Sequence, residues 1–116
     1  MEANELRIGN YVELLGKVRK VECISNLPAR KEMYWLTCEN MIDTKIIHFS
    51  PIPLTEEWLG KFNWNGYKPL HFNSNFEIDK QGRLYCNGDY KGVNINYVHQ
   101  LQNLYFALTG KELIIK

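Results

Sequence analysis

The sequence of 116 residues lacks clustered cysteines, an excess of charge of either sign, and long apolar runs. Its three cysteines, Cys23, Cys38 and Cys86, are too far apart to form the CxxC motif of a zinc or redox site. The formal net charge of +1 excludes a strongly basic nucleic-acid-binding chain and a strongly acidic nucleic-acid mimic. No apolar run approaches the roughly 20 residues that cross a bilayer, and the start MEANELRIGN does not resemble a signal peptide. We therefore expect a cytoplasmic protein without a membrane partner.

Motifs of catalysis and ligand binding are missing as well. The three histidines, His48, His71 and His99, are widely separated, and no HExxH motif or carboxylate cluster surrounds them, so we expect no metal site. The chain has no GxxxxGK[ST] or GxGxxG loop and no GxSxG elbow. We therefore predict no catalytic residue, no cofactor, no small-molecule substrate and no enzymatic activity. The alternative that folding assembles a catalytic group from distant residues stays open.

What the sequence does contain, over residues 6–50, is a series of short strand-like segments. LRIGNYVELLGKVRKVECISN predicts two strands joined at Gly16, and MYWLTCE and KIIHF, rich in aromatic and β-branched residues, predict two more. Such strands favour a small curled antiparallel sheet, SH3-like in this N-terminal part. Because the cysteines occupy these and similar apolar segments, we expect their thiols to be at least half-buried.

The second half of the chain predicts helices and a hairpin. Thr55 is a good N-cap for a short helix over TEEWLGKF. NFEIDKQGRLYCNG predicts a hairpin that turns near Gln81–Gly82, and the alternation of Val93, Ile95 and Tyr97 predicts a half-buried strand after it.

The segment YVHQLQNLYFALTG predicts an amphipathic helix that packs on the sheet and ends at Gly110. Its predicted core residues are Val98, Leu101, Leu104, Tyr105 and Leu108. We expect His99, in the first turn, to be exposed or capping and dispensable, and ELIIK to return as a terminal strand. The whole chain, residues 1–116, is then a single α+β domain: a curled sheet, a short central helix, a hairpin and one C-terminal helix.

Two features of the sequence indicate binding to a partner. The first is a basic set, Lys17, Arg19, Lys20, Arg30 and Lys31, which would contact phosphates if the hairpin and the following loop brought it together. The second is an aromatic-rich stretch in which Trp64 and Tyr67 flank a predicted exposed turn, where they could anchor a protein interface or stack on unpaired bases. A solvated hairpin and ordinary core packing are the simpler interpretations.

The segments ELRIGNYV, PIPLTEEWLGKF and NINYVHQLQNLYFALTGKELIIK together resemble a group of small uncharacterised proteins encoded by bacteriophages, prophages and other mobile elements of bacteria. The group has no established activity, so no functional residue is carried over from it. Proteins of this origin often inhibit host defence. The resemblance therefore implies an anti-CRISPR protein that binds an RNA-guided RNase, a bacterial defence nuclease, and disturbs its use of guide RNA. The alternative is a nucleic-acid-binding accessory module that uses the basic hairpin and the exposed aromatic residues.

Overall fold

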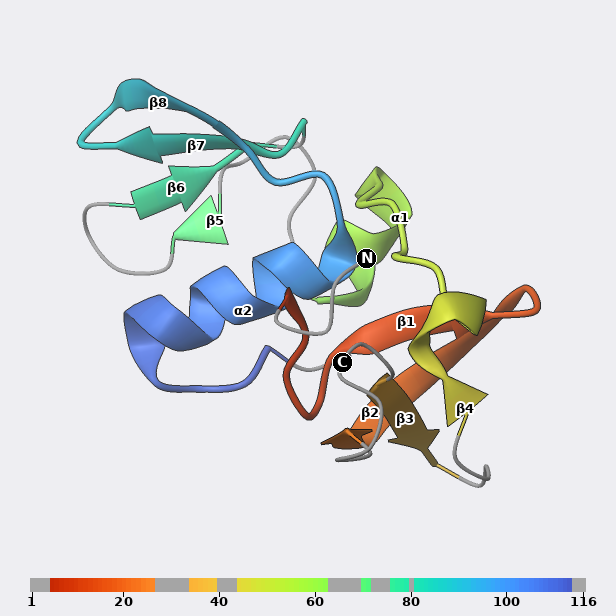
Figure 1. The fold of residues 1–116 in the computed structure, drawn as a ribbon. Helices are drawn as coiled ribbons and strands as arrows, with labels where there is room; N and C mark the ends of the chain where they lie inside the picture. Colours follow the sequence, from red (N-terminus) through yellow and green to blue (C-terminus); the bar gives the residue numbers. More distant parts are fainter. Residues whose placement is uncertain are drawn as a thin grey trace. The chain divides into compact units, whose positions relative to one another are not determined.

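The computed structural model of the protein describes residues 5–26, 34–39, 44–62, 70–71, 76–79 and 81–113. Contacts within the chain group it into two compact units, Met1–Ile52 and Pro53–Lys116. Each unit contains a four-stranded antiparallel sheet, and both α-helices belong to the second unit (Figure 1). The predicted α+β class is confirmed, whereas the assignment of residues 1–116 to a single domain stays a prediction.

The sheet of the first unit consists of β1 (Tyr11–Leu14), β2 (Lys17–Asn26), β3 (Tyr34–Cys38) and β4 (Thr44–Lys45), in that order. It confirms the predicted curled antiparallel sheet. After β4 the chain returns to β1, where Glu13 and Ser50 exchange two backbone hydrogen bonds of 2.9 Å. An SH3-like barrel would need this pairing of the last segment with the first strand, and the SH3-like assignment itself stays a prediction.

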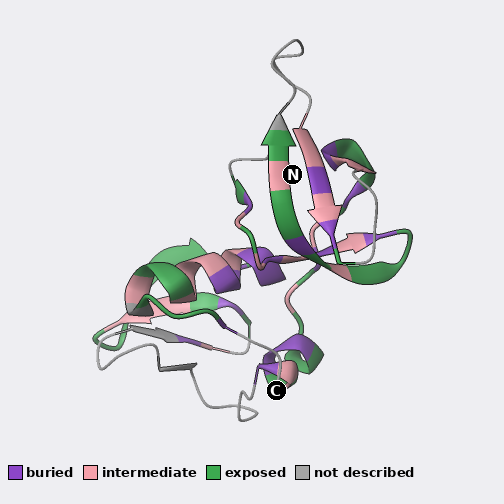
Figure 2. Cartoon of the chain, turned by 90° about the horizontal axis from the view of Figure 1, so that it is seen from below, coloured by how far each residue is buried: buried purple, intermediate pink, exposed green. Residues whose placement is uncertain are grey.

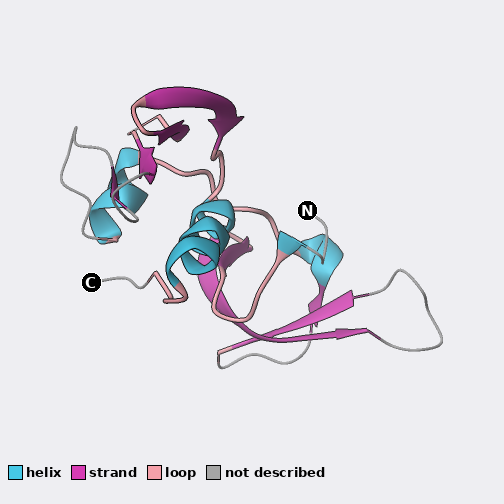
Figure 3. Cartoon of the chain, turned by 90° about the vertical axis from the view of Figure 1, so that its left-hand side faces the viewer, coloured by secondary structure: helices cyan, strands magenta, loops and turns pink. Residues whose placement is uncertain are grey.

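A bulge in β2 sets which of its side chains face the core. Val21 pairs with Cys38, but Cys23 already pairs with Thr37, so Glu22 is an extra residue in β2. Without it, residues three apart would point to opposite faces of the sheet. With it, Val21 and Ile24 both pack on the core, and β2 curves along its length (Figure 3). Cys23 then faces outward and is exposed, so the expectation of a buried thiol was wrong at this position.

The predicted strand KIIHF is also wrong, because η2 (Ile46–His48) is a short 3₁₀-helix. Ile46, its first residue, and Phe49, the residue after it, are both buried and lie three residues apart. The amide of Phe49 donates to the carbonyl of Ile46 at 3.0 Å. A strand would place these side chains on opposite faces, whereas a 3₁₀ turn repeats every three residues and buries both. Burial of two large apolar residues therefore outweighs the strand propensity of this segment.

The apolar core of the first unit includes residues from its strands, from η2 and from the segment before β1. Its buried members are Leu6, Val12, Leu14, Val21, Leu36, Cys38, Ile46 and Phe49. The buried side chain of Asn10 lies beside this core, and its Oδ1 accepts a 2.6 Å hydrogen bond from the amide of Arg7. A buried amide oxygen is stable only with such a partner, so Asn10 fixes the chain entering β1.

The sheet of the second unit consists of β5 (Leu70–His71), β6 (Phe76–Ile78), β7 (Arg83–Cys86) and β8 (Asp89–Asn94). The hairpin of β6 and β7 confirms the predicted turn near Gln81–Gly82. The strand predicted after the hairpin is present as β8, but it ends at Asn94 instead of continuing to Tyr97, and its six residues are exposed and not half-buried. β8 is an edge strand whose register against β7 shifts, and Gly92 lies in this irregular stretch with a φ of +74°. Such irregularity interrupts the inward–outward alternation of side chains that the sequence pattern assumes.

The short central helix is present as α1 (Glu56–Lys61). The hydroxyl of Thr55 accepts a 3.3 Å hydrogen bond from the amide of Trp58, which confirms Thr55 as the N-cap. Trp58, Leu59 and Phe62 are buried, so the apolar side of this helix faces a core.

The C-terminal helix is present as α2 (Val98–Thr109), and Gly110 ends it with a φ of +72°, as predicted. Figures 1 and 2 show α2 alongside the β5–β8 sheet. The side-chain oxygen of Gln100 accepts hydrogen bonds from the amides of Asn96 and Tyr97, at 2.9 and 3.2 Å. These bonds satisfy two donors at the helix start, as the Gln of a capping box does.

The burial of α2 corrects two expectations. Its buried residues, Val98, His99, Leu101 and Gln102, are all in the first turns, whereas Leu104 and Leu108 are only half-buried (Figure 2). His99 is 1% exposed and stacks on the ring of Tyr97 with centroids 5.9 Å apart, so it is not a surface residue. Burial is therefore concentrated in the first turns of the helix and does not extend along the whole apolar stripe that the residue spacing predicts. The predicted strand ELIIK is not formed at Glu112 and Leu113, and its remaining residues lie outside the described part.

Candidate functional site

The turn between β1 and β2 exposes an apolar side chain, that of Leu15, to solvent. Leu15 and Gly16 form this two-residue turn with φ values of 51° and 78°, the left-handed conformation that a type I′ turn requires at both positions. Asn, Asp and Gly adopt this conformation readily, whereas a leucine is strained in it. The side chain of Leu15 is 93% exposed, so burial in the described unit does not offset the strain.

The three basic residues of β2 point to different faces of the sheet. Lys17 pairs with Leu14 and Arg19 with Val12, and directly opposed residues share a face, so both are on the side of the core. Lys20 pairs with Tyr11 on the other face. Arg19 is half-buried and its Nε has no hydrogen-bond partner among the described residues.

The two lysines are exposed and differ from Arg19 in this respect. The other two predicted cations, Arg30 and Lys31, lie outside the described residues, so the convergence of all five stays a prediction.

We define the hairpin-tip patch as the exposed residues at this end of the hairpin: Leu15 in the turn, Lys17 on the core-side face of β2, and Val18 and Lys20 on its other face. Val18 is 46% exposed and pairs with Glu13, whose carboxylate is the nearest acid along the paired strand. Residues 14–21 contain three cations and no carboxylate. In the described ranges neither lysine forms an ion pair. The patch thus combines an apolar centre with unpaired positive charge.

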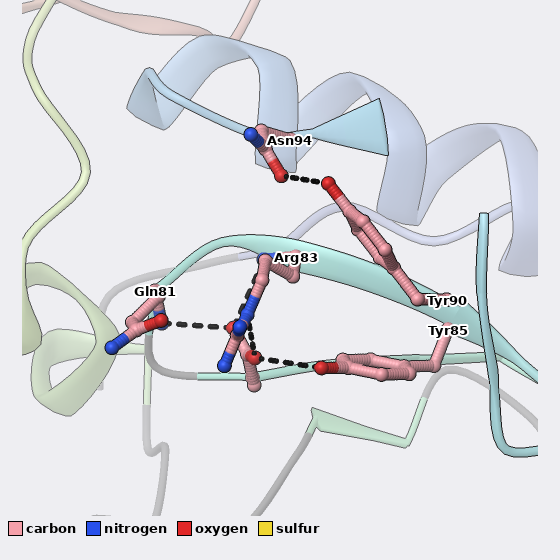
Figure 4. Close-up of polar contacts among 6 residues, drawn as sticks. Gln81, Arg83, Tyr85, Tyr90 and Asn94 are labelled. Carbon is pink, nitrogen blue, oxygen red and sulfur yellow. Dashed lines mark hydrogen bonds and ion pairs between the residues drawn. The ribbon is translucent and has the colours of Figure 1, made fainter. Parts of the chain in front are cut away.

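A second exposed surface, the tyrosine face, lies on β7 and β8 and consists of Arg83, Tyr85, Tyr90 and Asn94 (Figure 4). The two tyrosine rings pack at a centroid distance of 5.8 Å. The hydroxyl of Tyr90 donates to Asn94 at 2.9 Å, and that of Tyr85 donates to Asp79 at 3.3 Å. Both hydroxyls are therefore used within the sheet itself.

Asp79 holds the turn beside the tyrosine face. Its Oδ1 accepts from the amides of Gln81 and Arg83, both at 2.9 Å, and its Oδ2 accepts from Nε of Arg83 at 2.7 Å. Partial burial alone would raise the pKa of Asp79, but these hydrogen bonds and the charge of Arg83 outweigh it, and the pKa lies below its ordinary value. Because Arg83 is paired with this carboxylate, the tyrosine face has little net charge.

The remaining predictions concern the two aromatic candidates, metal binding and membrane-spanning helices. Trp64 and Tyr67, the two aromatic candidates, lie outside the described residues. Among the residues that the structure describes, no group of three His, Cys, Asp or Glu side chains could hold a metal ion. None of the helices in this described part is long and apolar enough to cross a membrane.

Sequence reasoning predicted the turn at Gly16 but missed the two apolar members of the hairpin-tip patch, Leu15 and Val18. A usable signal was the pair Leu14–Leu15 before Gly16: in a two-residue turn the residue before the glycine is outside both strands, so only one of these leucines can reach the core. The tyrosine face was also missed, although an Asp three residues before a Gly is typical of a four-residue β-turn such as the one beside this face.

No protein family, curated protein or solved structure matches this chain at a significant level, so the candidate site rests on its own geometry.

Proposed function

We propose that this protein is a non-enzymatic binding protein of phage type that acts in the bacterial cytoplasm. In this proposal it inhibits a defence nuclease, an RNA-guided RNase, and disturbs that enzyme's use of guide RNA. The observation that carries the binding role is the strained, exposed Leu15 at the centre of the hairpin-tip patch. The choice of partner comes from the resemblance to mobile-element proteins.

A stoichiometric inhibitor needs a rigid surface rather than a catalytic group. A stable interface buries about 800 Å² on each partner, and a few central side chains provide most of its affinity. A two-residue hairpin turn holds its side chains in a fixed direction, and strand pairing with β1 fixes the positions of Lys17, Val18 and Lys20 along β2. The first unit therefore offers a preorganised contact surface, which lowers the entropic cost of binding.

The test is a titration of a purified bacterial RNA-guided RNase, loaded with guide RNA, against increasing amounts of this protein. Inhibition should reach its end point near a fixed molar ratio, because each inhibitor molecule occupies one enzyme complex. Inhibition that continues at strongly sub-stoichiometric amounts would indicate catalytic turnover and contradict the proposal.

The second candidate function is a nucleic-acid-binding accessory module, and the observation that favours it is the tyrosine face. Tyr90 is 49% exposed, and aromatic rings on a sheet can stack on unpaired bases. The charge argues against it, because Arg83 is paired with Asp79 and the chain has a net charge of only +1.

We therefore expect weak binding of naked RNA that fades steeply with salt. Replacing the five cations Lys17, Arg19, Lys20, Arg30 and Lys31 with glutamate should matter for that binding only if they converge. Tight, salt-resistant binding of RNA by the isolated protein would favour this second function over the first.

A further inference from the structure

We propose that the hairpin-tip patch is the docking surface for the nuclease and that it fits an apolar pocket of a protein whose rim carries carboxylates. In this arrangement Leu15 enters the pocket, and Lys17 and Lys20 face the acidic rim. The inference rests on the proposed function, because it names the part of this chain that meets the same partner.

Two turns in the described part of the chain share the same left-handed backbone. Leu15 and Asn87 have φ values of 51° and 52°, and each precedes a glycine with a left-handed φ. Asn87–Gly88 is the favoured sequence for such a turn, whereas leucine is disfavoured there. A leucine at this position costs folding stability, and at 93% exposure no burial among the described residues offsets that cost. A contact with a partner would offset it.

The lysines near Leu15 are exposed and, among the described residues, unpaired. Lys17, between Leu15 and Val18, and Lys20, on the same face as Val18, make no ion pair in the described ranges. Residues 14–21 contain no carboxylate, and Glu13 lies opposite Val18 on the paired strand. Positive charge around an apolar centre complements a pocket with an acidic rim, and such pairing accelerates association and sets orientation.

The side chains of the hairpin-tip patch fit a protein better than an RNA as the occupant. Phosphates would be bound by the lysines alone, and unpaired bases stack on aromatic rings or guanidinium groups. An exposed leucine with a neighbouring valine provides neither of these contacts. It does provide an apolar side chain that can be fully desolvated on binding, as the apolar core of a protein interface requires.

The experiment uses the full chain with a purified RNA-guided RNase loaded with guide RNA, and with the guide RNA alone. Leu15→Asn removes the apolar anchor while giving the turn its favoured residue. It should leave Tm unchanged or higher and weaken binding to the loaded RNase by at least about tenfold. Asn87→Leu is the matched control: it places the strained leucine in the other turn and should lower Tm while leaving the affinity unchanged.

A third variant, Lys17→Glu with Lys20→Glu, should slow association and reduce its dependence on salt. If the parent binds and inhibits the RNase but Leu15→Asn binds equally well, the docking surface is elsewhere, and only this inference fails. If the parent does not bind the loaded RNase, the proposed function fails and this inference with it. Equal affinity of the parent for the guide RNA alone and for the loaded RNase would identify RNA as the occupant and overturn the protein pocket.

Discussion

The amide of Ile95 donates a 2.7 Å hydrogen bond to the carbonyl oxygen of Gly82, so the chain that leaves β8 passes against the β6–β7 turn. Gly82 has a φ of +82°, and a Cβ atom on it would overlap the carbonyl oxygen of Ile95. This position therefore requires glycine for two reasons, the left-handed backbone and the close approach of another segment. Gly88 has a φ of +85° but open space around it, so only the first reason applies there.

Replacement of these two glycines by alanine should lower the free energy of unfolding by different amounts. Gly88→Ala should lower the free energy of unfolding by about 1–2 kcal/mol, the penalty of a left-handed alanine. Gly82→Ala should cost at least about 1 kcal/mol more, since the Ile95 segment must also move. Urea unfolding of both variants measures the difference, and equal costs would show that the approach of Ile95 to Gly82 contributes no constraint.

The carboxylate of Asp79 predicts a dependence of stability on pH. Its pKa is lowered in the folded chain, so the stabilisation is present above the unfolded pKa of about 3.9 and is lost as the pH falls through the folded pKa. Asp79→Asn removes this titration and keeps a similar shape. The difference in unfolding free energy between parent and variant should therefore be larger at pH 7 than in acid, as measured by urea unfolding at both. A difference that grows in acid would contradict the sign of the shift.

The burial of α2 predicts a difference between two leucines that the sequence treats alike. Leu101 is fully buried and Leu104 is half-buried. Leu101→Ala should cost about 2–5 kcal/mol, because it leaves a cavity in the core. Leu104→Ala should cost clearly less, since solvent already reaches this side chain. Thermal melts of the two variants test the order, and a larger effect at Leu104 would contradict it.

Burial of His99 changes what its replacement is expected to do. Sequence reasoning predicts an almost neutral His99→Ala, but the side chain is 1% exposed and stacks on Tyr97. The substitution should cost about 2 kcal/mol or more, as other large-to-small changes in a core do. Lys91→Ala on the exposed strand β8 is the control and should stay within about 0.5 kcal/mol. A parent-like melt of His99→Ala would restore the original expectation.

The cysteines should differ in reactivity toward a maleimide. Burial raises the pKa of the Cys38 thiol, the carboxylate of Glu22 raises it further, and the opposing charge of Arg19 does not compensate. Cys38 is therefore both inaccessible and protonated, whereas Cys23 is exposed. Mass spectrometry after brief labelling should find Cys23 modified and Cys38 unmodified until urea is added. Early labelling of Cys38 in the native chain would show that the first unit opens readily.

Features that depend on neighbouring residues were predictable from the sequence. Thr55 caps α1 and Gly110 ends α2 because capping requires only a suitable residue next to the first or last turn. The turns at Gly16 and near Gly82 follow from the same local backbone preferences. Apolar and polar alternation likewise placed β1 and the β6–β7 hairpin, and aromatic and β-branched residues placed β3.

Only the tertiary structure decided which side chains those elements bury and which they expose. The bulge at Glu22 reverses the facing of β2 and turns Cys23 outward, and η2 replaces a strand so that Ile46 and Phe49 can both be buried. For the same reason His99 is buried and Leu15 is exposed, against the simplest reading of their chemistry. Burial depends on segments far apart in the chain, and no local pattern contains that information. The sequence by itself therefore determined the order and type of most elements, and the assembled fold determined the surface available to a partner.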